Sequence, residues 1–242
     1  MHNKVIAHNT FNYCGAKIPL DHNGLNIDIW KKKLTNYHDQ ELLNFLEFGW
    51  PLGLDPSIDL DSTLKNHPSS YQFADAVDKF IIKNIANNAI AGPSVLCPFQ
   101  NDICISPLMT VAKKPDGRRI VFDATFGVLS VNNATPRGEY LGHEYDFSFP
   151  KIDQFAEIIR NEGIGCLLWK KDLKNYFLQL MADPFNYNVM CFVWRNVLFF
   201  FVAMMFGLRN SGLAGQRTTT AVTYMFKVES ANFSGKEFNC GL

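Results

Sequence analysis

The chain has 242 residues, 47% of them hydrophobic and 14% aromatic, which excludes a disordered protein and suits one large domain or two small ones. Lysine plus arginine and aspartate plus glutamate both number 23, and this balance counts mildly against a strong nucleic-acid binder, which usually has a basic excess. The first residues, MHNKVIAHNT, lack the apolar core of a secretory signal, and the longest apolar run, Val197–Leu208, is too short for a membrane helix. We therefore expect an intracellular protein, of cytoplasm or nucleus, with reduced cysteines.

Hydrophobic spacing and turn residues predict the elements of the first half. Residues 1–35 are weakly patterned and are interpreted as a loose lead-in, and residues 51–68, with three prolines, as a loop. A short helix is expected over Asp39–Phe48, with Gly49 as its stop. A longer helix is expected over Ser70–Ala89, capped by Ser69 or Ser70 and ended by Gly92-Pro93.

The second half mixes predicted strands and helices without a regular βαβ alternation, which indicates an α+β fold. The predicted elements are a hairpin of Leu108–Lys113 and Arg119–Ala124 around Pro115-Asp116-Gly117, a helix over Lys151–Glu162 stopped by Gly163, a buried strand over Ile164–Trp169, a second hairpin of Tyr187–Trp194 and Val197–Met204, and a helix over Ser211–Lys227. If the sheet is incomplete, we expect its unpaired apolar edge, an aggregation hazard, at Val197–Met204.

The predicted strand Ile164–Trp169 is followed by a carboxylate, Asp172. A charge at the end of a buried strand is costly unless something pairs with it. A divalent metal is one such partner, because hard cations prefer carboxylate oxygens. The plain alternative is that Asp172 caps the amphipathic segment that follows, and the segment taken alone favours this cap.

The first hairpin is predicted to bring two cations to one tip. Lys113 stands near the end of one arm and Arg119 near the start of the other. Lysine supplies a point charge and arginine a planar fork, and together they suit a polyphosphate. A solvated turn with ordinary surface charges is the plain alternative, and the hairpin taken alone favours it.

A glycine-containing segment precedes the last predicted helix. Gly207 and Gly212 permit close backbone approach or positive φ. A helix beginning at Ser211 presents free N–H groups with Gln216 near its start, which would suit a nucleotide or a base pair. A plain helix N-terminus with a serine cap is the alternative.

The order and spacing of these pieces carry more information than any one of them. Over roughly residues 40–227 the series resembles the reverse transcriptases, above all those of tyrosine-recombinase (DIRS/Ngaro-like) retrotransposons. The matching residues are Asn66-His67-Pro68-Ser69, Gly92-Pro93, Ser106-Pro107-Leu108 with Val111 and Lys113, Gly117-Arg118-Arg119 with Asp123, Ser130-Val131-Asn132, Tyr140-Leu141-Gly142, Lys170 with Asp172-Leu173 and Phe177, Phe206-Gly207-Leu208-Arg209, and Gln216-Arg217-Thr218-Thr219.

The resemblance implies a role for each candidate residue. Asp172 would be the first metal-binding carboxylate of the palm, with the Leu173 carbonyl as a second Mg²⁺ ligand. Lys113 and Arg119 would hold the triphosphate of the incoming dNTP. Phe177 would exclude a ribose 2′-OH. The remaining position, Gln216, would lie beside the nascent base pair of an RNA/DNA primer–template.

The implied fold is α+β, the fingers and a truncated palm of a right-hand polymerase. Residues 1–65 would be the lead-in with a short helix, 66–165 a fingers-like region and 166–242 a partial palm. The implied activity is two-metal nucleotidyl transfer, which needs more than one carboxylate. The family's Y-x-D-D pair is missing, and the only acids after Asp172 are Asp183, Glu229 and Glu237. We therefore expect a fragment of an RNA-directed DNA polymerase that is inactive alone, and the alternative is a non-catalytic remnant that binds nucleic acid or protein.

Three positions depart from the family pattern. Tyr176 stands where a small residue is usual and would crowd the metal site. Gly212 and Gly215 replace the commoner proline and aromatic residue. Together with the missing carboxylates, these departures indicate a truncated or decaying copy of the element.

Overall fold

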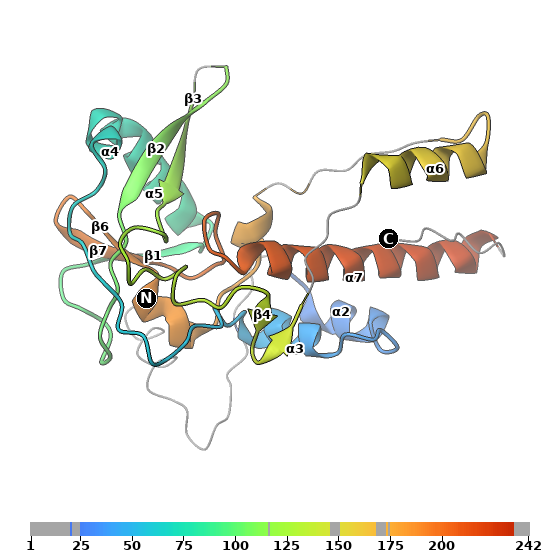
Figure 1. Ribbon diagram of the computed structural model, residues 1–242, viewed down its shortest axis with the longest axis horizontal. Helices are drawn as coiled ribbons and strands as arrows, with labels where there is room; N and C mark the ends of the chain where they lie inside the picture. The colour runs from blue at the N-terminus through green and yellow to red at the C-terminus, as the bar shows by residue number, and fades with distance from the viewer. Residues whose placement is uncertain are drawn as a thin grey trace.

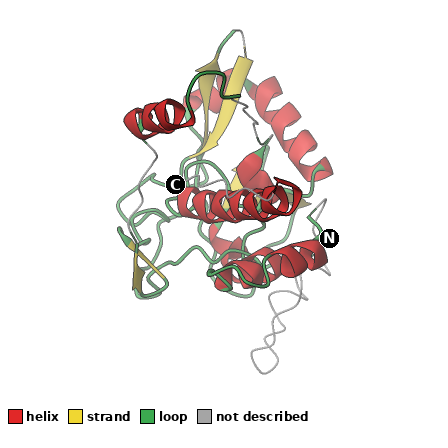
Figure 2. Ribbon diagram, turned by 90° about the vertical axis from the view of Figure 1, so that its right-hand side faces the viewer, coloured by secondary structure: helices red, strands yellow, loops and turns green. Residues whose placement is uncertain are grey.

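The computed structural model describes residues 20, 25–115, 117–145, 151–167, 173 and 175–234, without the side chains of 230–234. A body that contains the β1-β7-β6 sheet and the β2–β3 hairpin lies at one end, and the β4–β5 hairpin lies apart from it, near α3 (Glu41–Phe48). The long helix α7 (Ser211–Ser234) extends from the body, with α2 (Ile27–Lys33) and α3 along its side (Figure 1). The helices are α2 (Ile27–Lys33), α3 (Glu41–Phe48), α4 (Pro68–Gln72), α5 (Ala74–Ala86), α6 (Ile152–Glu162) and α7 (Ser211–Ser234), with the 3₁₀ turns η2 (Tyr176–Gln179) and η3 (Pro184–Val189). The strands, coloured yellow in Figure 2, are β1 (Ile90–Ser94), β2 (Leu108–Lys113), β3 (Gly117–Phe122), β4 (Glu139–Tyr140), β5 (His143–Glu144), β6 (Cys191–Trp194) and β7 (Val197–Phe201).

A three-stranded antiparallel sheet of order β1-β7-β6 forms the centre of the body. The β6–β7 connection is a two-residue turn in which Arg195 and Asn196 both have positive φ, the geometry that suits the twist of a hairpin. The β7 side chains Phe200 and Phe201 are almost completely buried. Since β7 is paired on both sides, the expectation of an exposed edge at this strand was wrong.

The strand β1 was not expected, because Gly92-Pro93 was interpreted as the end of a helix. The helix α5 instead ends at Ala86, and Ile90–Ser94 pairs with β7. The register shifts between Ala91 and Ser94, and such a bulge is where a strand tolerates a proline. Pairing with β7, which is distant in sequence, makes this segment a strand in spite of its local helix-stopping signal.

The predicted helix over Ser70–Ala89 is two helices, α4 and α5, with a break at Phe73 (φ −119°, ψ 46°). The Arg118 guanidinium lies 3.4 Å from the centre of the Phe73 ring. Neither serine is the cap, since His67 occupies the N-cap of α4. Ser70 Oγ instead donates to the Leu108 carbonyl at 2.6 Å, so this serine fastens α4 to β2.

Other expectations are confirmed within a few residues, namely the helix before Gly49, the β2–β3 and β6–β7 hairpins and the helix before Gly163. The last helix starts at Ser211 as expected but continues to Ser234, beyond the expected end at Lys227. Part of the expected lead-in is helical, because the Asn26 side chain accepts a hydrogen bond from the Ile29 amide and caps α2. Tyr187 belongs to η3 rather than to a strand.

The expected strand before Asp172 is not seen where the chain is described. Ile164 and Leu167 are fully or almost fully exposed and belong to no strand, because no described element covers them. Residues 168–172 lie outside the described part. Beyond them, the expected amphipathic α-helix is the short 3₁₀ turn η2.

No helix among the described residues is both long enough and apolar enough to cross a bilayer.

The central sheet joins β1, from the region expected to be fingers, to β6 and β7, from the region expected to be palm. The proposed boundary near residue 165 stays a prediction.

Candidate functional site

The β2–β3 hairpin has one buried face and one open face. In the antiparallel register Leu108 faces Phe122 and Thr110 faces Ile120, and all four side chains are buried. The alternate pairs, Val111 with Arg119 and Lys113 with Gly117, lie on the other face. Lys113 and Arg119 are therefore diagonal neighbours on the open face, and both are exposed. Among the described residues neither has a recorded ion pair.

Arg119 lies close to an exposed aromatic ring from a distant part of the chain. Its guanidinium is 6.0 Å from the centre of the Phe206 ring, within the range of a cation–π contact. Phe206, which is 63% exposed, meets the Phe177 ring edge-to-face at 4.7 Å between ring centres and 89° between planes. One exposed phenylalanine thus connects the hairpin cation to the predicted gate residue.

Phe177 packs in turn against the first turns of α7. A Cβ built on Gly215 would lie 3.0 Å from the Phe177 ring, so the bare backbone of this glycine makes room for the ring. Gln216 is the next residue of α7 and is half-buried. We define the aromatic site as Arg119, Phe206, Phe177 and Gly215. It brings two of the predicted residues, Arg119 and Phe177, into one neighbourhood, and Gln216 follows Gly215 along α7.

The turn that carries Phe206 is held against the end of β3. Gly207 has φ +104°, and an added Cβ would lie 2.8 Å from the Phe122 carbonyl oxygen. Asn132 receives a hydrogen bond on Oδ1 from the Arg209 amide at 2.8 Å and donates from Nδ2 to the Gly207 carbonyl. The S-V-N and F-G-L-R motifs therefore meet in space and fix the turn beside the hairpin.

The expected metal ligands are not assembled in the described part. Asp172 lies outside it, and Leu173 is described as an exposed residue. Within the described ranges no group of three or more histidine, cysteine, aspartate or glutamate side chains is arranged to hold a metal ion. The described donors alone do not fit a magnesium site.

Two of the three remaining acids have structural partners. Asp183 caps η3 by accepting a hydrogen bond from the Phe185 amide, and its side chain is almost completely buried. Glu229 forms an ion pair with Lys33 of α2. Glu237 lies outside the described residues.

No protein-family model matches the sequence, and no curated protein matches it either. Among solved structures, the chain is similar to the native prototype foamy virus protease–reverse transcriptase, with a TM-score of 0.47 and 16% identity over 84% of this chain and 28% of that one. A selenomethionine-labelled mutant of the same viral protein has a TM-score of 0.47 and 16% identity, and the match covers 90% of this chain and 26% of that one. The foamy viral protease–reverse transcriptase in complex with dsDNA has a TM-score of 0.45 and 15% identity, and the match covers 90% of this chain and 44% of that one. The chain therefore spans less than half the length of each of these structures.

Proposed function

We propose that residues 1–242 form the fingers and the first half of the palm of an RNA-directed DNA polymerase from a tyrosine-recombinase retrotransposon. In this proposal the aromatic site, together with Lys113, receives the incoming dNTP. The ordered motif series supports the family, and the geometry of the aromatic site supports the place of binding.

The observation that carries the proposal is the meeting of Arg119, Phe206 and Phe177. These residues come from a hairpin, a loop and a 3₁₀ turn, and they form a cationic end and an aromatic end within contact distance. The two hairpin cations suit a triphosphate, to which the arginine fork donates paired hydrogen bonds. The Phe177 ring suits the apolar side of a deoxyribose and leaves no partner for a 2′-hydroxyl.

Magnesium, with Asp172 and the Leu173 carbonyl as ligands, belongs to the same proposal, as does the RNA/DNA primer–template beside Gln216. When bound, the ion would stabilise the charge that develops on the phosphoryl oxygens. Residues 1–242 alone are expected to bind nucleotide without incorporating it, because Asp183 and Glu229 have other partners and no Asp-Asp pair is available.

The proposal predicts that purified 1–242 binds a dNTP and that Arg119→Ala weakens this binding. Charge-assisted hydrogen bonds are worth about 1.5–3 kcal/mol, so the loss should be about 10- to 100-fold in Kd by calorimetric titration. Arg118→Ala is the matched control, because the neighbouring arginine lies over Phe73 on the other face and should change Kd little.

Three results would contradict parts of the proposal. Equal effects of Arg118→Ala and Arg119→Ala on the Kd for dNTP would contradict a nucleotide site on the open face of the hairpin. Nucleotide incorporation by 1–242 that disappears in Asp172→Ala would refute the expected inactivity. Salt-dependent binding of primer–template without dNTP binding would favour the non-catalytic remnant, because phosphate contacts weaken as salt rises.

A further inference from the structure

Tyr176 fastens the turn that carries Phe177 to the helix α7. Its hydroxyl donates a hydrogen bond to the Gly215 carbonyl and lies 2.7 Å from Thr219 Oγ1. Its ring centre is 5.6 Å from that of Phe177. The side chain therefore points at α7 and holds η2 at two polar atoms one helical turn apart.

The surface that receives Tyr176 is a notch created by a glycine. A Cβ on Gly215 would stand 3.0 Å from Cε1 of Tyr176 and 3.0 Å from Cε1 of Phe177, closer than nine in ten real contacts of a Cβ atom. Both rings thus occupy the space that a side chain at this position would need. A side chain at position 215 would therefore require both rings to shift.

Two departures from the family pattern therefore compensate each other. The sequence has an aromatic residue at 176 where a small one is usual, and a glycine at 215 where an aromatic one is commoner. The structure brings these positions into contact, so the aromatic volume comes from η2 instead of α7.

We propose that Tyr176 is a positioning residue for Phe177, which it holds in the Gly215 notch and against Phe206. The choice of deoxyribo- over ribonucleotides then depends on Tyr176 as well as on Phe177. The nucleotide selectivity rests on the proposed function, whereas the anchoring of the Phe177 ring by Tyr176 does not.

The state of the Tyr176 hydroxyl is consistent with this role. Burial raises the pKa of Tyr176, and the hydrogen bonds from Thr219 and Thr218 lower it by less. The net shift is upward from a value already near 10, so at neutral pH the hydroxyl keeps the proton that it donates to Gly215.

The anchoring is tested without any ligand by placing 4-fluorophenylalanine at position 177 of the full chain and recording its ¹⁹F resonance. Tyr176→Ala should move and broaden this resonance and lower Tm by about 5 °C. Tyr176→Phe keeps the ring and should give an intermediate change. Adding Gly215→Phe to Tyr176→Ala places a ring from α7 in the notch and should restore part of the ¹⁹F resonance and part of the lost Tm. Gly215→Phe alone should lower Tm, because its ring would compete with Tyr176 for the same space.

The hydroxyl contact has its own matched pair of variants. Thr219→Ala removes a partner of Tyr176, while Thr220→Ala removes the same kind of back-bond to the helix without touching η2. We expect Thr219→Ala to shift the ¹⁹F resonance of residue 177 and Thr220→Ala to leave it in place. Equal shifts in the two variants would overturn the assigned contact.

The selectivity is tested by the ratio of Kd values for CTP and dCTP. The wild type should prefer dCTP by about tenfold or more, and Tyr176→Ala should bring the ratio towards one. An unchanged ¹⁹F resonance in Tyr176→Ala would overturn the positioning role. If the wild type binds neither nucleotide, the proposed function fails together with the selectivity statement, but the fluorine measurement still decides the anchoring. A moved resonance with an unchanged ratio would limit Tyr176 to a structural role and overturn its part in selectivity.

Discussion

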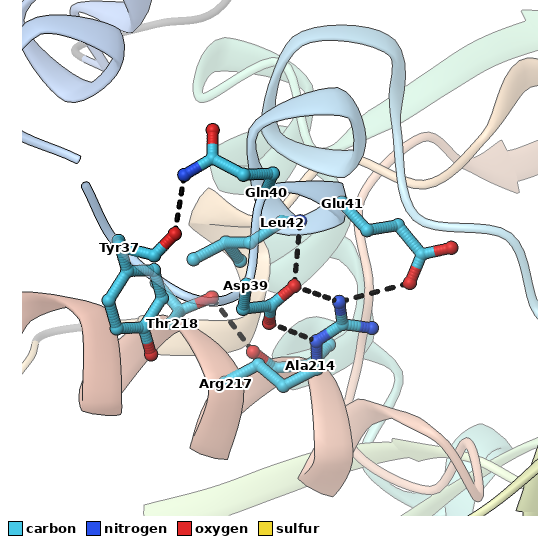
Figure 3. A network of polar contacts seen from close by, with 8 residues as sticks. All are labelled: Tyr37, Asp39, Gln40, Glu41, Leu42, Ala214, Arg217 and Thr218. Carbon is cyan, nitrogen blue, oxygen red and sulfur yellow. Dashed lines mark hydrogen bonds and ion pairs between the residues drawn. The ribbon is translucent and has the colours of Figure 1, made fainter. Parts of the chain in front are cut away.

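Asp39→Ala is expected to lower the free energy of unfolding by about 3 kcal/mol, because it leaves the half-buried Arg217 guanidinium without its main partner. Figure 3 shows the network between the start of α3 and the first half of α7. Arg217 donates to both Asp39 oxygens, at 2.6 and 2.7 Å, and to Glu41 at 3.1 Å. Burial lowers the pKa of Arg217, but the hydrogen bonds and charges of Asp39 and Glu41 outweigh it, so the pKa is raised.

The measurement is urea denaturation followed by circular dichroism. Glu41→Gln is the control, since Glu41 is 50% exposed and a solvated ion pair is worth about 0–1 kcal/mol. Asp39 Oδ1 also accepts a hydrogen bond from the Leu42 amide, so Asp39→Asn separates the loss of charge from the loss of this acceptor. Adding Arg217→Met to Asp39→Asn should recover stability, because the uncompensated charge is then gone. A stability loss in Asp39→Asn no larger than in Glu41→Gln would show that this ion pair does not anchor α3 to α7.

Local signals in the sequence were enough for several elements. Gly163 follows the last residue of α6, and Arg195-Asn196 forms the turn between two apolar strands, so spacing and turn residues predicted these boundaries closely. The tight turn predicted Lys113 and Arg119 close together at one tip, and the observed register places them on the same face. Each of these features depends on residues within a few positions of one another.

Features set by distant partners were missed. Ile90–Ser94 became a strand because β7 pairs with it, although Gly92-Pro93 is a helix-stopping signal. The break at Phe73 coincides with the contact from Arg118, more than 40 positions away.

The candidate site shows the same division between local and distant determinants. The motif series pointed to Arg119 and Phe177, but the ring that joins them, Phe206, was visible only as one letter of F-G-L-R. Tyr176 and Gly215 were noticed as separate departures, and only their contact shows that they form a pair.

Gly207→Ala is expected to lower the free energy of unfolding by about 3 kcal/mol and to abolish most dNTP binding. Two costs add at this position. The φ of +104° is strained for any residue with a side chain, at about 1–3 kcal/mol, and the new Cβ would stand 2.8 Å from the backbone oxygen of Phe122. Gly138→Ala is the control, because Gly138 has φ +71° but nothing within 4 Å of the added carbon. It should cost only about 1 kcal/mol and leave nucleotide binding intact.

The difference between the two alanine variants isolates the contact between the Phe206 turn and the end of β3. Relief of the clash requires the turn to move away from Phe122, and Phe206 moves with it, so Arg119 and Phe177 lose the ring that lies between them. Urea denaturation and calorimetric titration of dCTP on the same samples measure both consequences. If Gly207→Ala costs no more stability than Gly138→Ala, the backbone contact is not what fixes the turn. If it costs more but dCTP binds with an unchanged Kd, the nucleotide does not depend on the placement of Phe206, and the aromatic site is a packing feature rather than the binding site.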